Sequence, residues 1–146
     1  MKISQAGIDL IKHFEGCALQ SYRCPSNVPT IGYGHTHDVE DGETCTEEEA
    51  ENLLVEDLVE FEGYVNNLVT VPLEQNQFDA LVSWTFNLGP TNLGESTLLT
   101  RLNDKAFWDV PFQIKRWTRS NGKVLEGLVK RREAEANLFK KQLTEN

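Results

Sequence analysis

Apolar residues recur at intervals of three and four along most of this chain, which predicts a largely helical protein. Ser4 can cap the first predicted helix, and Gly16 is expected to end it in the left-handed conformation. Thr46 with Glu49 forms the pattern of a capping box at the start of the longest one. Six helices are predicted in all, over residues 4–14, 46–68, 75–88, 96–102, 106–118 and 126–142.

The segment over residues 17–36 departs from this helical pattern. Pro25 and Pro29 bracket a predicted turn, and a short strand is expected over residues 30–33. A second turn is expected over residues 120–122, between helices. Strands and helices do not alternate along the chain, which argues against a parallel sheet and favours an α+β fold.

The length of 146 residues predicts one domain, residues 1–146, with its own core and no need for disulfides or metal ions. No apolar run reaches the roughly 18 residues that a membrane span needs, and the start of the chain lacks the apolar core of a signal peptide. We therefore expect no membrane insertion and residence in the cytoplasm after synthesis. Three cysteines, an odd number, indicate free thiols.

The net charge of −9 is unevenly spread along the chain. Residues 1–62 carry 14 acidic and 3 basic side chains, whereas residues 101–146 carry 6 acidic and 11 basic ones. The acidic first part argues against nucleic acid as a partner, because phosphates attract a basic surface. The basic last part either contacts an anionic polymer or is a solvated helix face of mixed charge.

Candidate chemistry begins with Glu15 at the C-terminal end of the first predicted helix. There the helix dipole favours the protonated form of a carboxyl group, and glycosidic hydrolysis requires such an acid. Cys24 follows nine residues later and Thr30 six beyond that, which adds a potential nucleophile and a hydroxyl. This combination indicates hydrolysis of a bond, although an ordinary exposed glutamate is the alternative for Glu15 taken alone.

Cysteines and histidines between residues 17 and 45 raise two other kinds of chemistry. Their spacings lack the paired short intervals of zinc sites, so we expect neither a metal ion nor a cofactor. A Cys24–His35 dyad, as in a cysteine peptidase or amidase, is an alternative that requires an oriented histidine base.

The same segment resembles the phage-type lysozymes of glycoside hydrolase family 24. Their pattern is a Glu, an Asp (in some members a Cys) nine residues later and a Thr six beyond. These stand within Glu-Gly, Tyr-x-Asp and Thr-Ile-Gly-Tyr-Gly-His-Thr. This chain carries Glu15-Gly16, Tyr22-Arg23-Cys24 and the unbroken run over residues 30–36. Further matches follow in order over residues 75–81, 86–89, 96–99, 127–128 and 131–135.

This resemblance implies a two-lobed lysozyme-like fold. A small N-terminal lobe with a short β-sheet would be joined by a long helix to a helical C-terminal lobe. It also implies an endolysin, a muramidase that hydrolyses the β-1,4 bond between N-acetylmuramic acid and N-acetylglucosamine in bacterial peptidoglycan and so lyses the host. We expect a monomer that needs a holin to leave the host cytoplasm for the cell wall. A catalytically weak wall-binding protein of the same fold is the alternative.

The resemblance assigns Glu15 as the general acid and Thr30 as the hydroxyl near the attacking water. Cys24 stands where most members carry aspartate, and three interpretations of it stay open. Its thiolate replaces the carboxylate as base or charge stabiliser, helped by a cation such as Arg23. Alternatively it attacks the anomeric carbon, or it is a small residue with no role.

Two further groups complete the predicted site. By the resemblance, His35 forms a structural ion pair with Asp57 on the long helix. Candidate substrate contacts are Gln77, Asn87, Ser96 and Thr97, although ordinary helix capping explains Ser96 equally well. The three tryptophans are expected in the core, because they lie on apolar helix faces: Trp84, Trp108 and Trp117.

Overall fold

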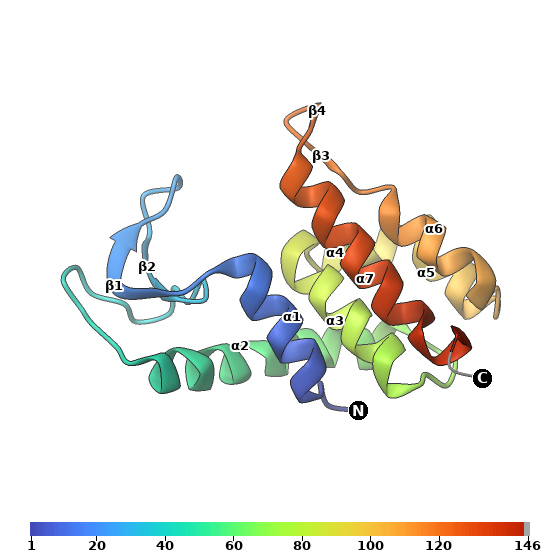
Figure 1. Cartoon of the computed structure of the whole chain (residues 1–146), viewed down its shortest axis with the longest axis horizontal. Helices are drawn as coiled ribbons and strands as arrows, with labels where there is room; N and C mark the ends of the chain where they lie inside the picture. Colours follow the sequence, from blue (N-terminus) through green and yellow to red (C-terminus); the bar gives the residue numbers. More distant parts are fainter. Residues whose placement is uncertain (145–146) are drawn as a thin grey trace. The chain divides into compact units, whose positions relative to one another are not determined.

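The computed structural model describes the backbone of residues 1–144 and the side chains of residues 1–141. It is an α+β structure in which helices outnumber strands (Figure 1). In chain order the elements are α1 (Gln5–Glu15), β1 (Ala18–Arg23), β2 (Pro29–Gly32), α2 (Glu47–Leu68), α3 (Gln75–Leu88), α4 (Pro90–Glu95), α5 (Thr97–Asn103), the 3₁₀ helix η1 (Phe107–Asp109), α6 (Val110–Lys115), β3 (Arg119–Ser120), β4 (Lys123–Val124) and α7 (Glu126–Thr144).

The backbone contacts divide the chain into two compact units. We call residues 11–59 the sheet unit, and residues 1–10 together with those from 60 onward the helical unit. Helices α1 and α2 each contribute residues to both units.

In the sheet unit, α1 ends at Gly16, which has φ +71° and donates its N–H to the carbonyl of Lys12. The left-handed stop predicted from the sequence is thereby confirmed. Strands β1 and β2 then pair antiparallel, with Tyr22 opposite Thr30. A bulge between Ala18 and Tyr22 shifts the register along β1.

The long helix α2 begins at the capping box predicted from the sequence. The Thr46 hydroxyl accepts the N–H of Glu49 at 3.1 Å, and the Glu49 carboxyl accepts the N–H of Thr46 at 3.0 Å. Two orphan N–H groups of the first turn are satisfied in this way. Ile31 of β2 and Leu54 and Leu58 of α2 are fully buried core residues of this unit.

The core of the helical unit is built around α3, most of whose residues are buried. Phe78, Leu81 and Trp84 are fully buried there, and α7 packs along α3 and α6 (Figure 1). The first residues of the chain are tied to the same core, because the Ser4 N–H donates to Asp79 at 3.0 Å. The Ser4 hydroxyl donates to the other oxygen of this carboxylate.

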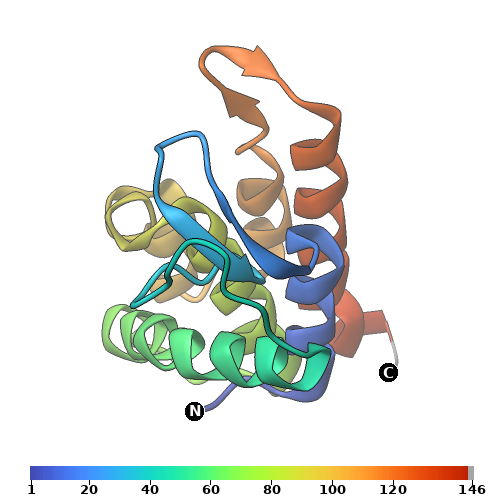
Figure 2. The same ribbon diagram turned by 90° about the vertical axis from the view of Figure 1, so that its left-hand side faces the viewer.

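Three features of the helical unit differ from the sequence prediction. Residues 119–124 form a second hairpin, which extends beyond the start of α7 (Figure 2), where only a turn was expected. Its two-residue loop has positive φ at Asn121 and Gly122, the conformation of a tight hairpin turn. Helix α4 was not predicted. Pro90 occupies its first helical position, where no N–H is needed.

Trp108 is the third difference: its side chain is 75% exposed, so its predicted place in the core was wrong. The helix expected over residues 106–118 is broken into η1 and α6, which changes the direction in which Trp108 faces. Its ring instead lies 5.3 Å from the guanidinium of Arg101. Trp84 is fully buried and meets the half-buried Trp117 edge-on.

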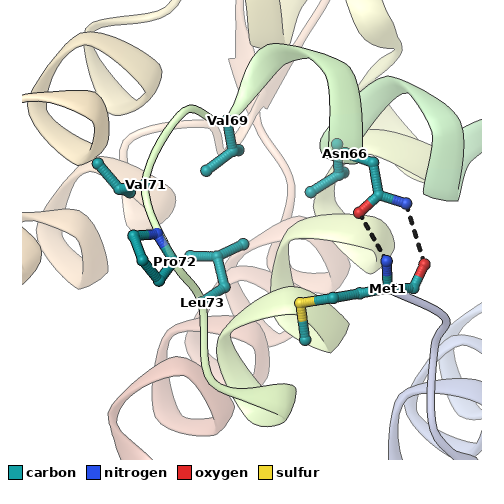
Figure 3. A pocket seen from close by; sticks show the side chains of 7 residues that line it. Met1, Asn66, Val69, Val71, Pro72 and Leu73 are labelled. Atoms are coloured by element: carbon teal, nitrogen blue, oxygen red, sulfur yellow. Dashed lines mark hydrogen bonds between the residues drawn. The ribbon is translucent and has the colours of Figure 1, made fainter.

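A hollow of about 230 Å³ lies between the start of the chain and the segment after α2 (Figure 3). Asn66 spans one side of it, accepting a hydrogen bond from the amino group of Met1 and donating one to the Met1 carbonyl. The remaining lining side chains are apolar: Val65, Val69, Val71, Pro72 and Leu73.

Candidate active site

Glu15 is the last residue of α1 and is half-buried. Its carboxyl faces Gly34, since a β-carbon added at that glycine would lie 3.6 Å from Oε1 of Glu15. Gly34 belongs to a tight loop that Ile31 and His35 close by exchanging both backbone hydrogen bonds at 2.9 Å. Glu15 thus lies at the end of one helix and beside the loop after β2.

Cys24 stands in the turn between β1 and β2, and its side chain is partly buried. Its N–H donates to the Val28 carbonyl at 3.1 Å, and its carbonyl accepts the N–H of Asn27 at 2.7 Å. Hydrogen bonds from the backbone N–H groups of Val28 and Ser26 lower the pKa of the Cys24 thiol. The turn therefore favours the thiolate.

The cause of this lowered pKa differs from the one the sequence suggested. One of the three interpretations of Cys24 offered Arg23 as a cation beside the thiolate. Its guanidinium instead binds Asp41 at 2.6 Å and the Asn27 carbonyl at 3.0 Å. Backbone N–H groups of a turn, which no residue pattern specifies directly, act on Cys24 in its place.

Thr30 lies on β2 and is almost fully buried. Its hydroxyl donates to the Val28 carbonyl at 2.9 Å, so its remaining capacity is mainly that of an acceptor. The structure brings Thr30 and Cys24 together around Val28. Glu15, Cys24 and Thr30 all belong to the sheet unit.

All three cysteines are free thiols, as the odd count predicted. Cys17 is exposed, whereas Cys45 is partly buried, and burial raises the pKa of the Cys45 thiol. Among the residues that the structure describes, no three histidine, cysteine or acidic side chains gather as metal ligands would.

His35 contacts Asp57 within the sheet unit. Its Nδ1 lies 2.8 Å and 3.0 Å from the two oxygens of the Asp57 carboxylate, and its Nε2 lies 2.8 Å from the His37 carbonyl. Both ring nitrogens are therefore already hydrogen-bonded. This geometry disfavours a Cys24–His35 dyad, because that dyad needs a free ring nitrogen to act as base.

The four candidate substrate contacts belong to the helical unit, and their surroundings differ. Gln77 is buried, and its side-chain oxygen accepts the N–H of Glu74 at the start of α3. Ser96 is also buried and caps α5 by accepting the N–H of Leu99 at 3.0 Å. Thr97 and Asn87 are exposed and are the two whose side chains face solvent.

A polar pocket of about 210 Å³ adds residues that the sequence did not indicate. It is lined by Ser96 and Thr97 together with Glu95, Arg116 and Trp117. Arg116 and Trp117 stand just after α6, some 20 residues along the chain from Thr97. No local pattern joins these segments, so only the fold brings them together.

A sequence profile for phage lysozyme matches residues 12–135. The endolysin of Acyrthosiphon pisum secondary endosymbiont phage 1 is 43% identical over 143 residues, covering 95% of this chain and 98% of that protein. The endolysin of Salmonella phage P22 is 40% identical, with 95% and 98% covered. The endolysin of Bacillus phage B103 is 47% identical, but the match covers 54% of that longer protein and 95% of this chain.

Solved structures give the same answer for the fold. The muramidase domain of SpmX from Asticaccaulis excentricus superposes with a TM-score of 0.90 at 44% identity, covering 94% of this chain and 97% of that one. A crystal structure of a P22 lysozyme mutant gives a TM-score of 0.89 at 40% identity, covering 95% and 98%. The predicted lysozyme-like α+β fold is confirmed by these matches.

Proposed function

Because this chain belongs to the phage lysozyme family, we propose that it is an endolysin of glycoside hydrolase family 24 with cysteine in place of the catalytic aspartate. As a muramidase it hydrolyses the β-1,4 bond between N-acetylmuramic acid and N-acetylglucosamine in peptidoglycan. The observation that carries this proposal is the family match over residues 12–135, which includes Glu15, Cys24 and Thr30.

In the proposed mechanism Glu15 is the general acid. It donates its proton to the glycosidic oxygen as the bond to the anomeric carbon breaks and positive charge develops on the sugar. Gly34 leaves room beside this carboxyl for the leaving group, because it places no side chain there. General acid catalysis of this kind contributes about 10²–10⁴ to the rate.

Cys24 acts in this mechanism as the base, in thiolate form. Water donates one proton to the thiolate and attacks the anomeric carbon from the face opposite the leaving oxygen, so that the configuration inverts. The N–H groups of Val28 and Ser26 support this role, because they lower the pKa of the thiol. Thr30 accepts the second hydrogen of the water, since its own proton is donated to Val28.

One variant and two measurements test whether the protein is an enzyme of this kind. Glu15→Gln should clear permeabilised bacterial cells at least about 100-fold more slowly than the wild type. Masses of fragments released from purified peptidoglycan should show hydrated reducing ends at N-acetylmuramic acid. Equal clearing by both proteins would favour the wall-binding alternative, and new amine termini without reducing ends would indicate an amidase.

The role of Cys24 is tested by Cys24→Ser and Cys24→Asp. Serine keeps the size but not the acidity, so we expect about a 100-fold loss or more, whereas aspartate should retain activity. The activity of the wild type should rise with pH through the thiol pKa, and Cys24→Asp should move that rise to lower pH. Full activity of Cys24→Ser would make the thiol dispensable. Inversion releases the α anomer first, so initial release of the β anomer by the wild type would instead show retention by a covalent intermediate.

The proposed route to the cell wall begins in the host cytoplasm. Within the part of the chain that the structure describes, no helix is both long and apolar enough to cross a bilayer. We therefore propose that a monomer accumulates inside the cell and passes through a membrane pore made by a holin. Expression with and without a pore-forming protein should show lysis only in its presence, and light scattering should give the mass of one chain.

A further inference from the structure

A buried arginine lies beneath one of the exposed candidate substrate contacts of the helical unit. Arg132 on α7 is fully buried, and its Nη2 donates to Oδ1 of Asn87 at 2.5 Å. Asn87 is exposed in the last turn of α3. The pair therefore joins a buried charge to an amide group that faces solvent.

The guanidinium of Arg132 decides how this amide is turned. A guanidinium has five N–H donors and no acceptor, so only the oxygen of Asn87 can face it. The amide nitrogen of Asn87 then points away from Arg132, with its two N–H donors on the exposed side. An asparagine without such a partner presents either end of its amide to solvent.

Arg132 is itself held by a buried acidic residue. Its Nε lies 2.9 Å from Oε1 of Glu135, which is also fully buried. The other oxygen of Glu135 accepts hydrogen bonds from the Ser83 hydroxyl at 2.6 Å and from Nε of Arg131 at 3.2 Å. These contacts join α3 to α7 and fix the guanidinium beneath Asn87.

Stability alone does not account for this arrangement. Burial lowers the pKa of Arg132 to about 10 and raises the pKa of Glu135, so both charges are unfavourable where they are. Among the described residues, Nη1 and Nε of Arg132 have no well-aligned hydrogen-bond acceptor. Well-packed apolar side chains would join two helices without leaving N–H donors unpaired. Buried charges and unpaired donors of this kind concentrate at functional sites.

We propose that Arg132 is a positioning residue that holds the Asn87 amide with its N–H donors outward, where they bind a carbonyl oxygen of the wall polymer. The acceptor is a neutral amide carbonyl, which peptidoglycan carries in its acetamido groups and in its stem peptides. This inference rests on the proposed muramidase function, which supplies the substrate that Asn87 meets.

Asn87→Asp removes the outward N–H donors of the Asn87 amide while keeping the size of the side chain. Aspartate keeps an oxygen for Arg132, but it replaces the outward donors with an oxygen that repels a carbonyl group. We expect an unchanged or higher unfolding temperature, a KM for purified peptidoglycan at least about tenfold higher, and a kcat within about twofold of the wild type. Thr91→Asp, an exposed position on α4, adds the same charge and should leave KM unchanged.

Arg132→Met tests the positioning itself. The released amide would present its oxygen outward part of the time, so KM should rise by about two- to threefold. In an Asn87→Ala background the same Arg132→Met change should raise KM no further, because Arg132 acts through Asn87. An equal rise in both backgrounds would overturn the positioning role. If Arg132→Met does not fold, the KM of Asn87→Asp alone tests the proposal.

Glycan strands stripped of their peptides distinguish the two sources of the carbonyl. If Asn87→Asp weakens inhibition by these strands, Asn87 binds the acetamido group. If it only raises the KM for intact wall, Asn87 binds the stem peptide. A wild-type KM for an active Asn87→Asp protein would overturn this inference alone. Wild-type activity no higher than that of Glu15→Gln would overturn the proposed function, and this inference would fall with it.

Discussion

Gly34 lies against the carboxyl of Glu15, so that a β-carbon at position 34 would be 3.6 Å from Oε1. Gly34 also has φ +86°, a conformation that side chains disfavour. Glycine is thus suited to this position for two reasons, the space beside the acid and the shape of the loop.

Gly34→Ala should therefore lower both stability and activity. The positive φ destabilises alanine by about 1–2 kcal/mol, and the added methyl group crowds the side of Glu15 that the leaving group approaches in the proposed mechanism. Urea unfolding and clearing of permeabilised cells measure the two effects. Gly42→Ala is the matched control, because Gly42 has φ +83° with nothing within 4 Å, so it should lose stability but keep activity. An equal loss of activity in both variants would remove the role of Gly34 beside the acid.

Cys24 and Cys45 should titrate in opposite directions from an ordinary thiol. Hydrogen bonds from Val28 and Ser26 lower the pKa of Cys24, whereas burial raises the pKa of Cys45. Since only the thiolate is alkylated, the midpoint of alkylation against pH should be lower for Cys24. Mass spectrometry of iodoacetamide-treated protein across pH 5 to 10, about the range of thiol titration, measures both midpoints together. A Cys24 midpoint at or above that of Cys45 contradicts the prediction.

Asp57→Asn should destabilise the sheet unit by about 1.5–3 kcal/mol, the range for hydrogen bonds to charged groups. It removes the charge that faces the His35 ring at 2.8 Å. Asp41→Asn breaks the contact with Arg23. The side chains of Arg23 and Asp41 are 45% and 64% exposed, so the loss should be about 1 kcal/mol or less. Denaturant unfolding of the two variants under one set of conditions makes the comparison. Similar losses in both would count against a structural role for the His35–Asp57 pair.

Asp109→Asn should destabilise the protein at neutral pH but not in acid. Hydrogen bonds from Gln113 and Arg101 lower the pKa of Asp109 in the folded protein. The stability that a lowered carboxyl pKa provides is present above the unfolded value, about 3.9, and is lost as the pH falls through the folded value. Unfolding temperatures of wild type and variant should converge as the pH falls below about 4. A difference that stays constant with pH would show that ionisation of Asp109 is not involved.

The elements that the sequence predicted well are those whose signals are local. The capping box of Thr46 and Glu49 fixes the start of α2, and Pro25 with Pro29 fixes the turn that holds Cys24. Helix α3 spans the predicted residues 75–88, because its apolar face repeats at helical spacing and Gly89 follows it. Each of these signals lies within a few residues of the structure it specifies.

The features that the sequence did not predict depend on direction or on distant partners. The exposure of Trp108 depends on where a helix breaks, and periodicity does not give that. The two-residue strands β3 and β4 are too short to show alternation. The hydrogen bond from Arg132 to Asn87 joins residues 45 apart in the chain, so no local spacing predicts it. The lowered pKa of Cys24 depends on where the N–H groups of a turn point.

The turn that lowers the pKa of the Cys24 thiol also makes this residue more sensitive to oxidation. A partly exposed thiolate is oxidised by peroxide first to sulfenic acid, which thiols reverse, and then to sulfinic acid, which they do not. A carboxylate in the same position would be inert to both steps. The hydrogen bonds that lower the pKa of the Cys24 thiol therefore also favour its oxidation, so a reducing agent should preserve this thiol during storage.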